Sequence, residues 1–517
     1  MLRNYLILSL GLAGIFPVSE VSAAGGERHV IVMVWDGMRP DFVTAEYAPT
    51  LHQLAQNGVW FENNHPVYVS TTEVNGTAIA TGCYPEIDGI IGNREFRPEI
   101  DPVKSVHTEG IDVVRKGDEI TGGKYIRVPT VAEILHAKGR KTAVAGAKPV
   151  ALLHDRAQRG NSALGVTLFA GQTVPTDFLQ TILPLHGAFP SATNANPTRN
   201  DWTAEALIDP LWKDGVPAFS LVWMSEPDFS QHQTGPGSAR SLSAIKNADD
   251  NLARILRALD AKGVRDTTDI MIVSDHGFST IASVVDVAGN LRSGGFNAVR
   301  DPKPKPDPGE IMVVSSGGSM LLYVAGHDQA VIKKLVAFLQ RQSYPGVILA
   351  RESFPGAFRL HDVHLDSPNA PDVVVSMRWM PDKNKNGAPG MIVFDAFDLG
   401  PSQGMHGTLG PSDMHNTLVA AGPDFRHGVV DHLPTGNVDV APTALWILGE
   451  KKAVRKMNGR VLTEALSIPG PQIKSYEPRH LEASHDSGGV KWHQYLNYSE
   501  VNGVSYFEDG NGGQAEK

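Results

Sequence analysis

The chain of 517 residues contains a single cysteine, Cys83, so no disulfide can form within it. Small exported domains often depend on disulfides, and a chain without them must draw its stability from a large hydrophobic core. The apolar fraction of 41% and the charged fraction of 20% are those of an ordinary globular protein and exclude a disordered or fibrous chain. The length suffices for one large domain with insertions or for two or three domains.

Positive charge is also scarce. The 46 Lys and Arg residues are outnumbered by 56 Asp and Glu, which gives a formal net charge of -10. A surface that binds a nucleic-acid polymer needs clustered Lys and Arg to neutralise the phosphates, so the composition argues against such a partner. A small phosphate-ester substrate remains compatible, because bound metal ions can supply positive charge locally.

Long apolar runs are absent except near the N-terminus. Arg3 precedes an apolar run over residues 5–18, and small residues follow at positions 21–24. This pattern predicts a signal peptide over residues 1–24 and a mature chain that is secreted or periplasmic, without a transmembrane segment. A membrane anchor is the alternative, which is disfavoured because the run is shorter than the ~20 residues that span a bilayer. The sequence carries no indication of the oligomeric state.

Alternation of apolar strands and amphipathic helices predicts the fold class. Five β-branched, apolar runs are typical of buried strands in a parallel sheet: residues 29–35, 142–147, 218–225, 269–274 and 417–422. Helical patterns lie between them, the clearest over residues 242–259, where apolar residues recur every three or four positions. The pattern predicts an α/β sandwich around a mostly parallel sheet.

Two stretches interrupt this alternation. Residues 94–128 are rich in charge and glycine and are interpreted as a loop or cap insertion, and residues 290–400 as a small inserted α+β cap subdomain. The catalytic domain is therefore predicted over residues 27–465. A C-terminal tail follows over residues 466–517, in which residues 492–507 are predicted as a hairpin with an Asn-Gly turn.

Candidate metal ligands follow the predicted strands, where ligands collect in open α/β sheets. They are three aspartates and three histidines: Asp36, Asp228, His232, Asp275, His276 and His406. Asp228 and His232 lie at i and i+4, so one helical turn points both at one ion. Such ligands suit two Zn²⁺ or similar ions, and two metals ~4 Å apart can clamp the attacking and leaving oxygens of a phosphoryl displacement. An Asp after a strand can also simply cap a helix, so it is the joint pattern that predicts a metal centre.

A nucleophile is expected from the segment that contains Ser70, Thr71 and Thr72. A Thr at a loop-to-helix junction can bind a metal, which lowers the pKa of its hydroxyl and makes it a nucleophile. The helix N-terminus then presents backbone N–H groups to the phosphoryl oxygens. The alternative is that the three hydroxyls only cap the helix.

The order of these motifs resembles the type I phosphodiesterase/nucleotide pyrophosphatase family of the alkaline phosphatase superfamily. The matching stretches are residues 34–37, 72–75, 81–85, 89–93, 227–232, 274–277 and 406–407. The resemblance implies an alkaline-phosphatase-like fold, a three-layer sandwich with a cap. It also implies a two-zinc phosphoric ester hydrolase of the phosphodiesterase/nucleotide pyrophosphatase type that works through a covalent phospho-threonine.

The resemblance also implies a role for each site residue. One zinc would be held by Thr72 together with three further ligands: Asp36, Asp275 and His276. The other zinc would be held by a second set: Asp228, His232 and His406. Asn93 is similar to the family asparagine that donates a hydrogen bond to a non-transferring phosphoryl oxygen, an interaction typically worth ~3 kcal/mol.

Two positions depart from the family pattern. Glu73 replaces an aromatic residue beside the nucleophile, which argues against stacking of a nucleotide base. Its carboxylate can repel a doubly charged monoester, bind a cationic headgroup or face solvent. Lys148 matches the first of two basic residues found in related monoesterases, but Val150 stands in place of the second. A single cation suits a singly charged diester, although Lys148 keeps a monoester substrate open.

Other functions stay in consideration. The nearest is a phosphomonoesterase or a phosphonoacetate-type hydrolase on the same scaffold. An exported, non-catalytic metal-binding protein is the alternative from another class; it predicts a missing ligand or nucleophile, and none is missing. The sequence specifies neither the natural substrate and its leaving group nor the physiological metal.

Overall fold

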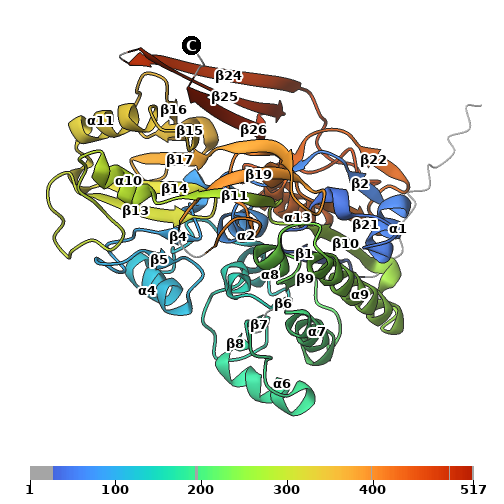
Figure 1. The fold of residues 1–517 in the computed structure, drawn as a ribbon. Coiled ribbons are helices and arrows are strands. Elements are labelled where there is room, and N and C mark those ends of the chain that lie inside the picture. The colour runs from blue at the N-terminus through green and yellow to red at the C-terminus, as the bar shows by residue number, and fades with distance from the viewer. Residues whose placement is uncertain (1–26, 193–195, 397–398, 488, 515–517) are drawn as a thin grey trace, which may run out of the picture.

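The computed structural model describes residues 27–192, 196–396, 399–487 and 489–514 (Figure 1). The predicted signal peptide, residues 1–24, lies outside these ranges. Within them, no helix combines the length and the apolar character that crossing a membrane requires.

A nine-stranded sheet forms the centre of the molecule. Its strands are β1 (His29–Trp35), β2 (Val59–Phe61), β6 (Thr142–Gly146), β7 (Gly165–Phe169), β8 (Gln172–Val174), β9 (Phe219–Met224), β10 (Thr268–Val273), β21 (Leu418–Ala421) and β22 (Val429–Asp431). They run in the order β22-β2-β21-β10-β1-β9-β6-β7-β8. The five middle strands β10, β1, β9, β6 and β7 are parallel, whereas β21 is antiparallel to β10. The five strands predicted from apolar runs are confirmed to within one residue at each end.

Helices cover both faces of this sheet, as Figure 1 shows. They are α1 (Pro49–Asn57), α2 (Thr72–Thr81), α5 (Val131–His136), α7 (Pro197–Ala206), α9 (Ala239–Ala261) and α13 (Val440–Ile447). Side chains of α2, α5 and α13 pack into one core with alternate residues of β1, and those of α1, α7 and α9 pack on the opposite face. Because β1 is buried on both faces, it must be apolar at every position, which explains its continuous apolar run. The predicted three-layer α/β sandwich is confirmed.

A second, six-stranded sheet lies beside the first. Its strands are β12 (Ala298–Val299), β13 (Ile311–Ser316), β14 (Ser319–Val324), β15 (Pro345–Ala350), β16 (Phe358–Arg359) and β17 (Val373–Met377). Helices α10 (Val287–Ser293) and α11 (Gln329–Leu339) pack against one face of this sheet. The result is an α+β unit, in agreement with the predicted cap.

The range predicted for the cap nevertheless divides between two sheets. Strands β18 (Trp379–Lys383) and β19 (Pro389–Asp395) leave the six-stranded sheet and pair in the order β18-β19-β11-β20 with β11 (Ser279–Val285) and β20 (Gly404–Met405). This four-stranded sheet ends one residue before His406, so it determines where that histidine lies.

The C-terminal segment forms a third layer over the cap. Strands β24 (Tyr476–Ser487), β25 (Val490–Val501) and β26 (Val504–Gln514) make an antiparallel sheet, drawn in red in Figure 1. Asn502 and Gly503 have positive φ angles of 52° and 81° at the β25–β26 turn, so the predicted hairpin is confirmed. Trp492 packs into the core beneath α11. The polar strand β24 was missed because it lies mostly exposed and has no apolar pattern.

Candidate metal centre

Neighbouring parallel strands bring most of the predicted ligands together. Asp36 follows β1, Asp275 and His276 follow β10, and Asp228 begins helix α8 (Asp228–Thr234) beyond the end of β9. Since β10, β1 and β9 are adjacent and parallel, their carboxyl ends meet at one edge of the sheet. Only His406 differs, because it follows β20 and therefore enters from the four-stranded sheet.

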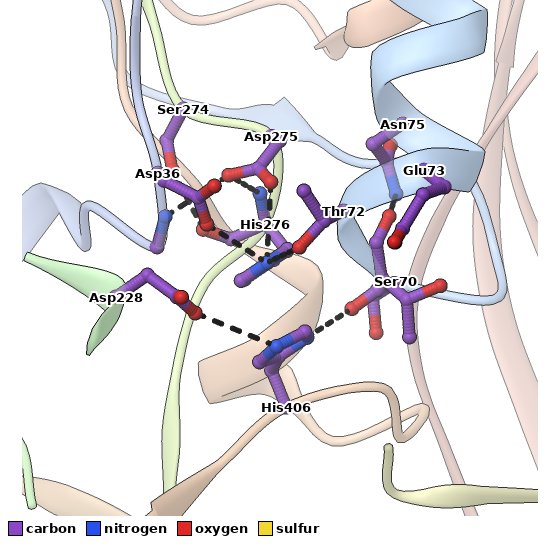
Figure 2. Close-up of polar contacts among 12 residues, drawn as sticks. Asp36, Ser70, Thr72, Glu73, Asn75, Asp228, Ser274, Asp275, His276 and His406 are labelled. Carbon is purple, nitrogen blue, oxygen red and sulfur yellow. Dashed lines mark hydrogen bonds and ion pairs between the residues drawn. The ribbon is translucent and has the colours of Figure 1, made fainter. Parts of the chain in front are cut away.

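The six predicted ligands form two clusters, and Figure 2 labels all of them except His232. In each cluster one ligand atom per residue lies within 4.8 Å of the others. The first cluster is fully buried and consists of Asp36, Asp275 and His276. The second is less enclosed and consists of Asp228, His232 and His406, in which the His232 side chain is 20% exposed. As expected, Asp228 and His232 share one turn of α8.

The three imidazoles are held in the orientation that metal ligands require. Each Nδ1 lies against a backbone carbonyl, which can only accept, so each Nδ1 carries the proton and each Nε2 keeps its lone pair. The pairs are His276 with Gly277 O at 2.8 Å, His232 with Gly404 O at 2.9 Å and His406 with Ser70 O at 2.9 Å. Burial lowers the pKa of His276 and that of His406, which keeps these rings in the neutral form that binds metals.

The carboxylates show the complementary feature. Asp36 Oδ1, Asp228 Oδ1 and Asp275 Oδ2 are buried without a hydrogen-bond partner. Their other oxygens are bound, because Trp223 Nε1 donates to Asp36 Oδ2 at 2.8 Å and Gly37 N donates to Asp275 Oδ1 at 2.9 Å. Burial raises the pKa of Asp275 to about 7 and that of Asp36 well above its usual range, where Asp228 and Asp275 add to the effect. Cations at these oxygens would complete the site, so the residues fit a pair of bound metal ions.

Lys148 lies between the two clusters. Its Nζ is 2.8 Å from Asp36 Oδ2 and 3.0 Å from Asp228 Oδ2. Val150, at the position of the absent second cation, is fully buried beneath α2. A Cβ at Gly76 would come within 2.7 Å of Val150 Cγ2, so the helix packs directly on this side chain. Core packing therefore occupies the place of the second basic residue.

Thr72 is the first residue of α2 and points into the centre (Figure 2). Its Oγ1 is 3.3 Å from His276 Nε2. The N-cap residue Thr71 makes no side-chain cap hydrogen bond, and Ser70 Oγ donates instead to Thr408 O at 2.9 Å. The hydroxyls of Ser70 and Thr71 therefore do not cap helix α2, which argues against the alternative that the hydroxyls of this segment serve only as helix caps.

Asn93 lies against the first turn of α2. Its side-chain Oδ1 accepts a hydrogen bond from Glu73 N at 3.1 Å, and its backbone N–H donates to Ser316 Oγ at 3.1 Å. The side-chain nitrogen Nδ2 is then the group of Asn93 that can donate to a ligand. Asn93, Glu73 and His232 line one cavity of about 520 Å³ beside the metal centre.

Glu73 is buried, with only 4% of its surface exposed, which rules out the alternative that it faces solvent. The reason is tertiary: Glu73 lies in the first turn of α2, a helix that is buried on every side. Burial raises the pKa of Glu73 well above its usual range, and the nearby carboxyl group of Glu109 raises it further.

Several residues that support the site were not identified from the sequence. Asn437 Nδ2 donates to Asn75 Oδ1 at 3.0 Å and to Asp275 O at 2.7 Å, which connects the nucleophile helix to a ligand-bearing strand end. Trp223, which binds Asp36, occupies a buried position in β9. Its apolar surroundings in the sequence are those of any core residue, so no local signal distinguishes it. Asn75 belongs to a motif that was recognised, but its bonds to the carbonyls of Val67 and Thr71 were not foreseen.

Comparisons with known proteins agree with this geometry. The family described as type I phosphodiesterase/nucleotide pyrophosphatase matches residues 30–408. A bis(5'-adenosyl)-triphosphatase of Xenopus laevis is 24% identical over 427 residues, which are 81% of this chain and 77% of the relative. A venom phosphodiesterase of Naja atra is 21% identical over 259 residues, 49% of this chain and 26% of the relative.

Solved structures show the same fold. Human ectonucleotide pyrophosphatase/phosphodiesterase 5 superposes with a TM-score of 0.56 at 16% identity, over 82% of this chain and 95% of the other. An inactive variant of the murine protein in complex with AMP gives 0.55 at 18% identity, with the same coverage. The alkaline-phosphatase-like fold is thereby confirmed. Because the family match extends over most of its length, the chain belongs to the type I phosphodiesterase/nucleotide pyrophosphatase family, whose members are hydrolases of phosphoric esters.

Proposed function

We propose that this chain is a two-zinc phosphodiesterase that acts through a covalent phospho-threonine at Thr72. One observation carries the proposal: the Thr72 hydroxyl starts helix α2 and lies 3.3 Å from His276 Nε2, beside two buried clusters of metal-ligating side chains. Asp36, Asp275, His276 and Thr72 would hold one zinc, and Asp228, His232 and His406 the other. When bound, the two ions supply Lewis-acid stabilisation of the charge that develops on the oxygens at phosphorus.

The residues of the chain would carry the reaction in two displacements. Thr72 Oγ1 forms a bond to phosphorus as the bond to the leaving ester oxygen breaks, with the two oxygens in line. Backbone N–H groups at the start of α2 and the amide nitrogen of Asn93 donate to the other phosphoryl oxygens. Water then attacks phosphorus, the bond to Thr72 breaks, and the hydroxyl is restored.

A diester is favoured over a monoester by the distribution of charge. Lys148 is bound by Asp36 and Asp228, and buried Val150 replaces a second cation. A singly charged phosphodiester needs less compensation than a doubly charged monoester. The names of several relatives refer to nucleotides, but Glu73 in place of an aromatic residue argues against base stacking directly beside Thr72. A phosphomonoesterase or phosphonoacetate-type activity is the alternative on the same scaffold.

Export is part of the proposal. Residues 1–24 have the pattern of a signal peptide, and relatives include ectonucleotide and venom enzymes by name. The intact mass of the protein recovered from its native compartment tests this. Cleavage near residue 23 or 24 is expected, and an uncleaved N-terminus on membranes would indicate an anchor instead.

The deciding experiment compares two substrates on the zinc-loaded chain. We expect kcat/KM for a nitrophenyl phosphodiester to exceed that for nitrophenyl phosphate by ~100-fold or more, about 2.7 kcal/mol of discrimination. Thr72→Ala should abolish turnover, and Thr72→Ser should restore part of it. Mass spectrometry of acid-quenched reactions on the diester should find its phosphoryl group, with the retained ester arm still attached, on the peptide that contains Thr72.

Three results would count against the proposal. Preference for the monoester would make the chain a phosphatase. Full activity of Thr72→Ala would remove the covalent step. Stoichiometric zinc without turnover of either ester would indicate a binding protein.

A further inference from the structure

A concentrated basic surface lies on a chain whose net charge is negative. Two segments that are distant in the sequence make it: residues 138–141, between α5 and β6, and residues 451–456, which include α14 (Lys451–Val454). Arg140 connects them, because its Nη1 donates to Leu448 O at 2.7 Å and lies 3.8 Å from a carboxyl oxygen of Glu450. Together the segments contribute seven cations, which form the basic patch: Lys138, Arg140, Lys141, Lys451, Lys452, Arg455 and Lys456.

The protein does not neutralise the basic patch itself. Neither segment contains an acidic side chain, and every cation of the patch except Arg140 is exposed. Among the described residues, Arg140 alone of the seven has an ion-pair partner, Glu450. Lysines on other surfaces do find such partners, in the pairs Lys116 with Glu119, Lys246 with Asp250 and Lys303 with Asp307. The charge of the patch is therefore available to an anionic group outside the protein.

The arrangement also opposes the stability of α14. Lys451 begins the helix and Arg455 is its C-cap, so the two like charges are four residues apart, a spacing at which they repel each other. Lys451 and Lys452 occupy the first two helical positions, where the helix dipole disfavours cations. Because the charges do not help the fold, an external partner is the better explanation for them.

A tryptophan beside the patch favours a lipid surface as that partner. Trp446 in α13 is partly buried, and Lys451 Nζ lies over its ring, 4.5 Å from the centroid. Its Nε1 donates to Pro469 O at 3.1 Å. Lys451 thus occupies a ring face on which a nucleic-acid base would have to stack. Amphipathic Trp rings next to clustered cations are typical of protein surfaces that meet lipid headgroups.

The patch and the metal centre lie at opposite edges of the central sheet. Lys141 directly precedes β6, which is parallel to β9, as β9 is to β1. The amino ends of these strands therefore share one edge, whereas Asp36 and Asp228 follow the carboxyl ends of β1 and β9 at the other. A surface bound at the patch leaves the cavity beside Thr72 accessible to substrate.

We propose that the basic patch docks this protein on a membrane surface that carries anionic lipids. The exposed Lys and Arg side chains contact the lipid phosphates, and Trp446 lies at the level of the headgroups. Such binding is reversible and weakens with salt, because it depends on charges that are exposed to solvent. The inference is independent of the chemistry proposed at Thr72, since docking requires no turnover.

Sedimentation with lipid vesicles tests the inference. The mature, zinc-loaded protein is mixed with vesicles of phosphatidylcholine alone or of phosphatidylcholine with phosphatidylglycerol. We expect ~100-fold tighter binding to the anionic vesicles at low salt, and ~10-fold weaker binding to them when the ionic strength is raised to the physiological value. Equal binding to the two kinds of vesicle would overturn the inference.

Two double variants with the same change in net charge locate the binding surface. Lys451→Glu with Lys452→Glu should lower the affinity for anionic vesicles by ~100-fold. Lys333→Glu with Lys334→Glu is the matched control, because these lysines are also adjacent, exposed and helical, but lie on α11. The control should bind as the wild type does, and both variants should keep their thermal stability and their kcat/KM for a soluble nitrophenyl diester. An equal loss of binding in the two would show that only the net charge matters and would overturn the inference.

Further probes separate a lipid surface from other anions. Lys138→Glu with Lys141→Glu changes the second segment and should lower the affinity for anionic vesicles by ~10-fold or more, which keeps the test decisive if the first variant does not fold. Trp446→Ala should weaken vesicle binding by ~3-fold and leave binding to heparin unchanged. Tighter binding to heparin than to anionic vesicles would assign the patch to a soluble polyanion instead. Displacement of the protein from vesicles by free glycerol phosphate would assign it to a single small anion.

Discussion

Buried carboxyl groups lie at both ends of the central strands, but the protein compensates their charge differently at the two ends. At the carboxyl ends, Asp36 and Asp275 are fully buried, and each keeps an oxygen without a partner. At the amino end of β10, Asp269 is also buried with Oδ2 unpaired, but its Oδ1 accepts a hydrogen bond from Asp424 N at 3.0 Å, and Arg28 forms an ion pair with Asp424 at 3.0 Å. The same residue type on the same strand therefore belongs to a candidate ligand site at one end and to the protein's own framework at the other.

The difference is one of internal compensation. Burial raises the pKa of Asp269 to about 8, and the neighbouring carboxyl group of Asp424 adds to this, so a bound proton and one arginine balance the amino end. At the carboxyl end, three carboxylates face a single lysine, and burial lowers the pKa of His276 and that of His406, so these two rings add no positive charge. An uncompensated group of ligands marks a site, whereas acidic residues by themselves do not.

The largest effect is expected when a ligand is removed from the carboxyl end. Asp36→Asn should lower kcat/KM for a phosphodiester by ~10³-fold, about 4 kcal/mol, because the zinc proposed for the fully buried cluster would lose a charged ligand. The zinc content, measured by inductively coupled plasma mass spectrometry, should fall by one ion per chain. Asp269→Asn, the same change at the other end of the sheet, is the control and should keep both zinc and activity. Equal zinc loss in Asp36→Asn and Asp269→Asn would contradict the claim that metal binds only at the carboxyl ends of the strands.

The next effect separates the two clusters at the carboxyl end. His232 is partly exposed at the cavity, whereas His276 is fully buried. His232→Ala should lose ~10²-fold in kcat/KM, about 2.7 kcal/mol, and regain activity when free zinc is raised, because water can fill the open coordination position. His276→Ala should show no such recovery. Activity measured as a function of free zinc tests both variants. Recovery of His276→Ala alone would contradict the prediction that the cluster of His232 is the open one.

Asp269 should make stability depend on pH. Its pKa is raised to about 8 in the folded chain, so between about pH 4 and 8 the native state holds a proton that the unfolded chain releases. The free energy of unfolding of the wild type should therefore fall as pH rises through this window and level off above it. Asp269→Asn cannot titrate, so its gain over the wild type should grow from pH 5 to pH 8 and reach at least ~2 kcal/mol, measured by denaturant unfolding. A gain that is independent of pH would show that Asp269 is ionised in the fold.

The smallest effect is expected from a residue that positions the site without touching substrate. Asn437→Ala removes the bonds to Asn75 and Asp275 and should lower kcat by ~10-fold, with little change in KM. Asn437→Asp replaces the side-chain amide that donates both bonds with a carboxylate that can only accept, and should not recover activity. If Asn437→Ala lowers only the thermal stability and leaves kcat unchanged, Asn437 stabilises the fold and does not position the site.

The main features of fold and site were predictable because they depend on short segments. Continuous apolar runs identified the buried strands, and the spacing of Asp228 and His232 predicted a shared helical turn. The resemblance to a family then supplied the expectation that the remaining ligands belong together. The structure brings those ligands into two clusters, whereas their roles as zinc ligands and that of Thr72 as nucleophile stay predictions.

Long-range packing decided the rest. His406 reaches the centre from β20, because β18 and β19 leave the predicted cap to join a different sheet. Glu73 is buried rather than exposed, since the cap and the C-terminal sheet enclose helix α2 and its surroundings. Asn437 joins two segments that lie 362 and 162 residues away from it. Local patterns specify which side chains stand at the ends of strands, but the partners of a buried side chain depend on segments that are distant in the chain, and only the folded molecule brings them into contact.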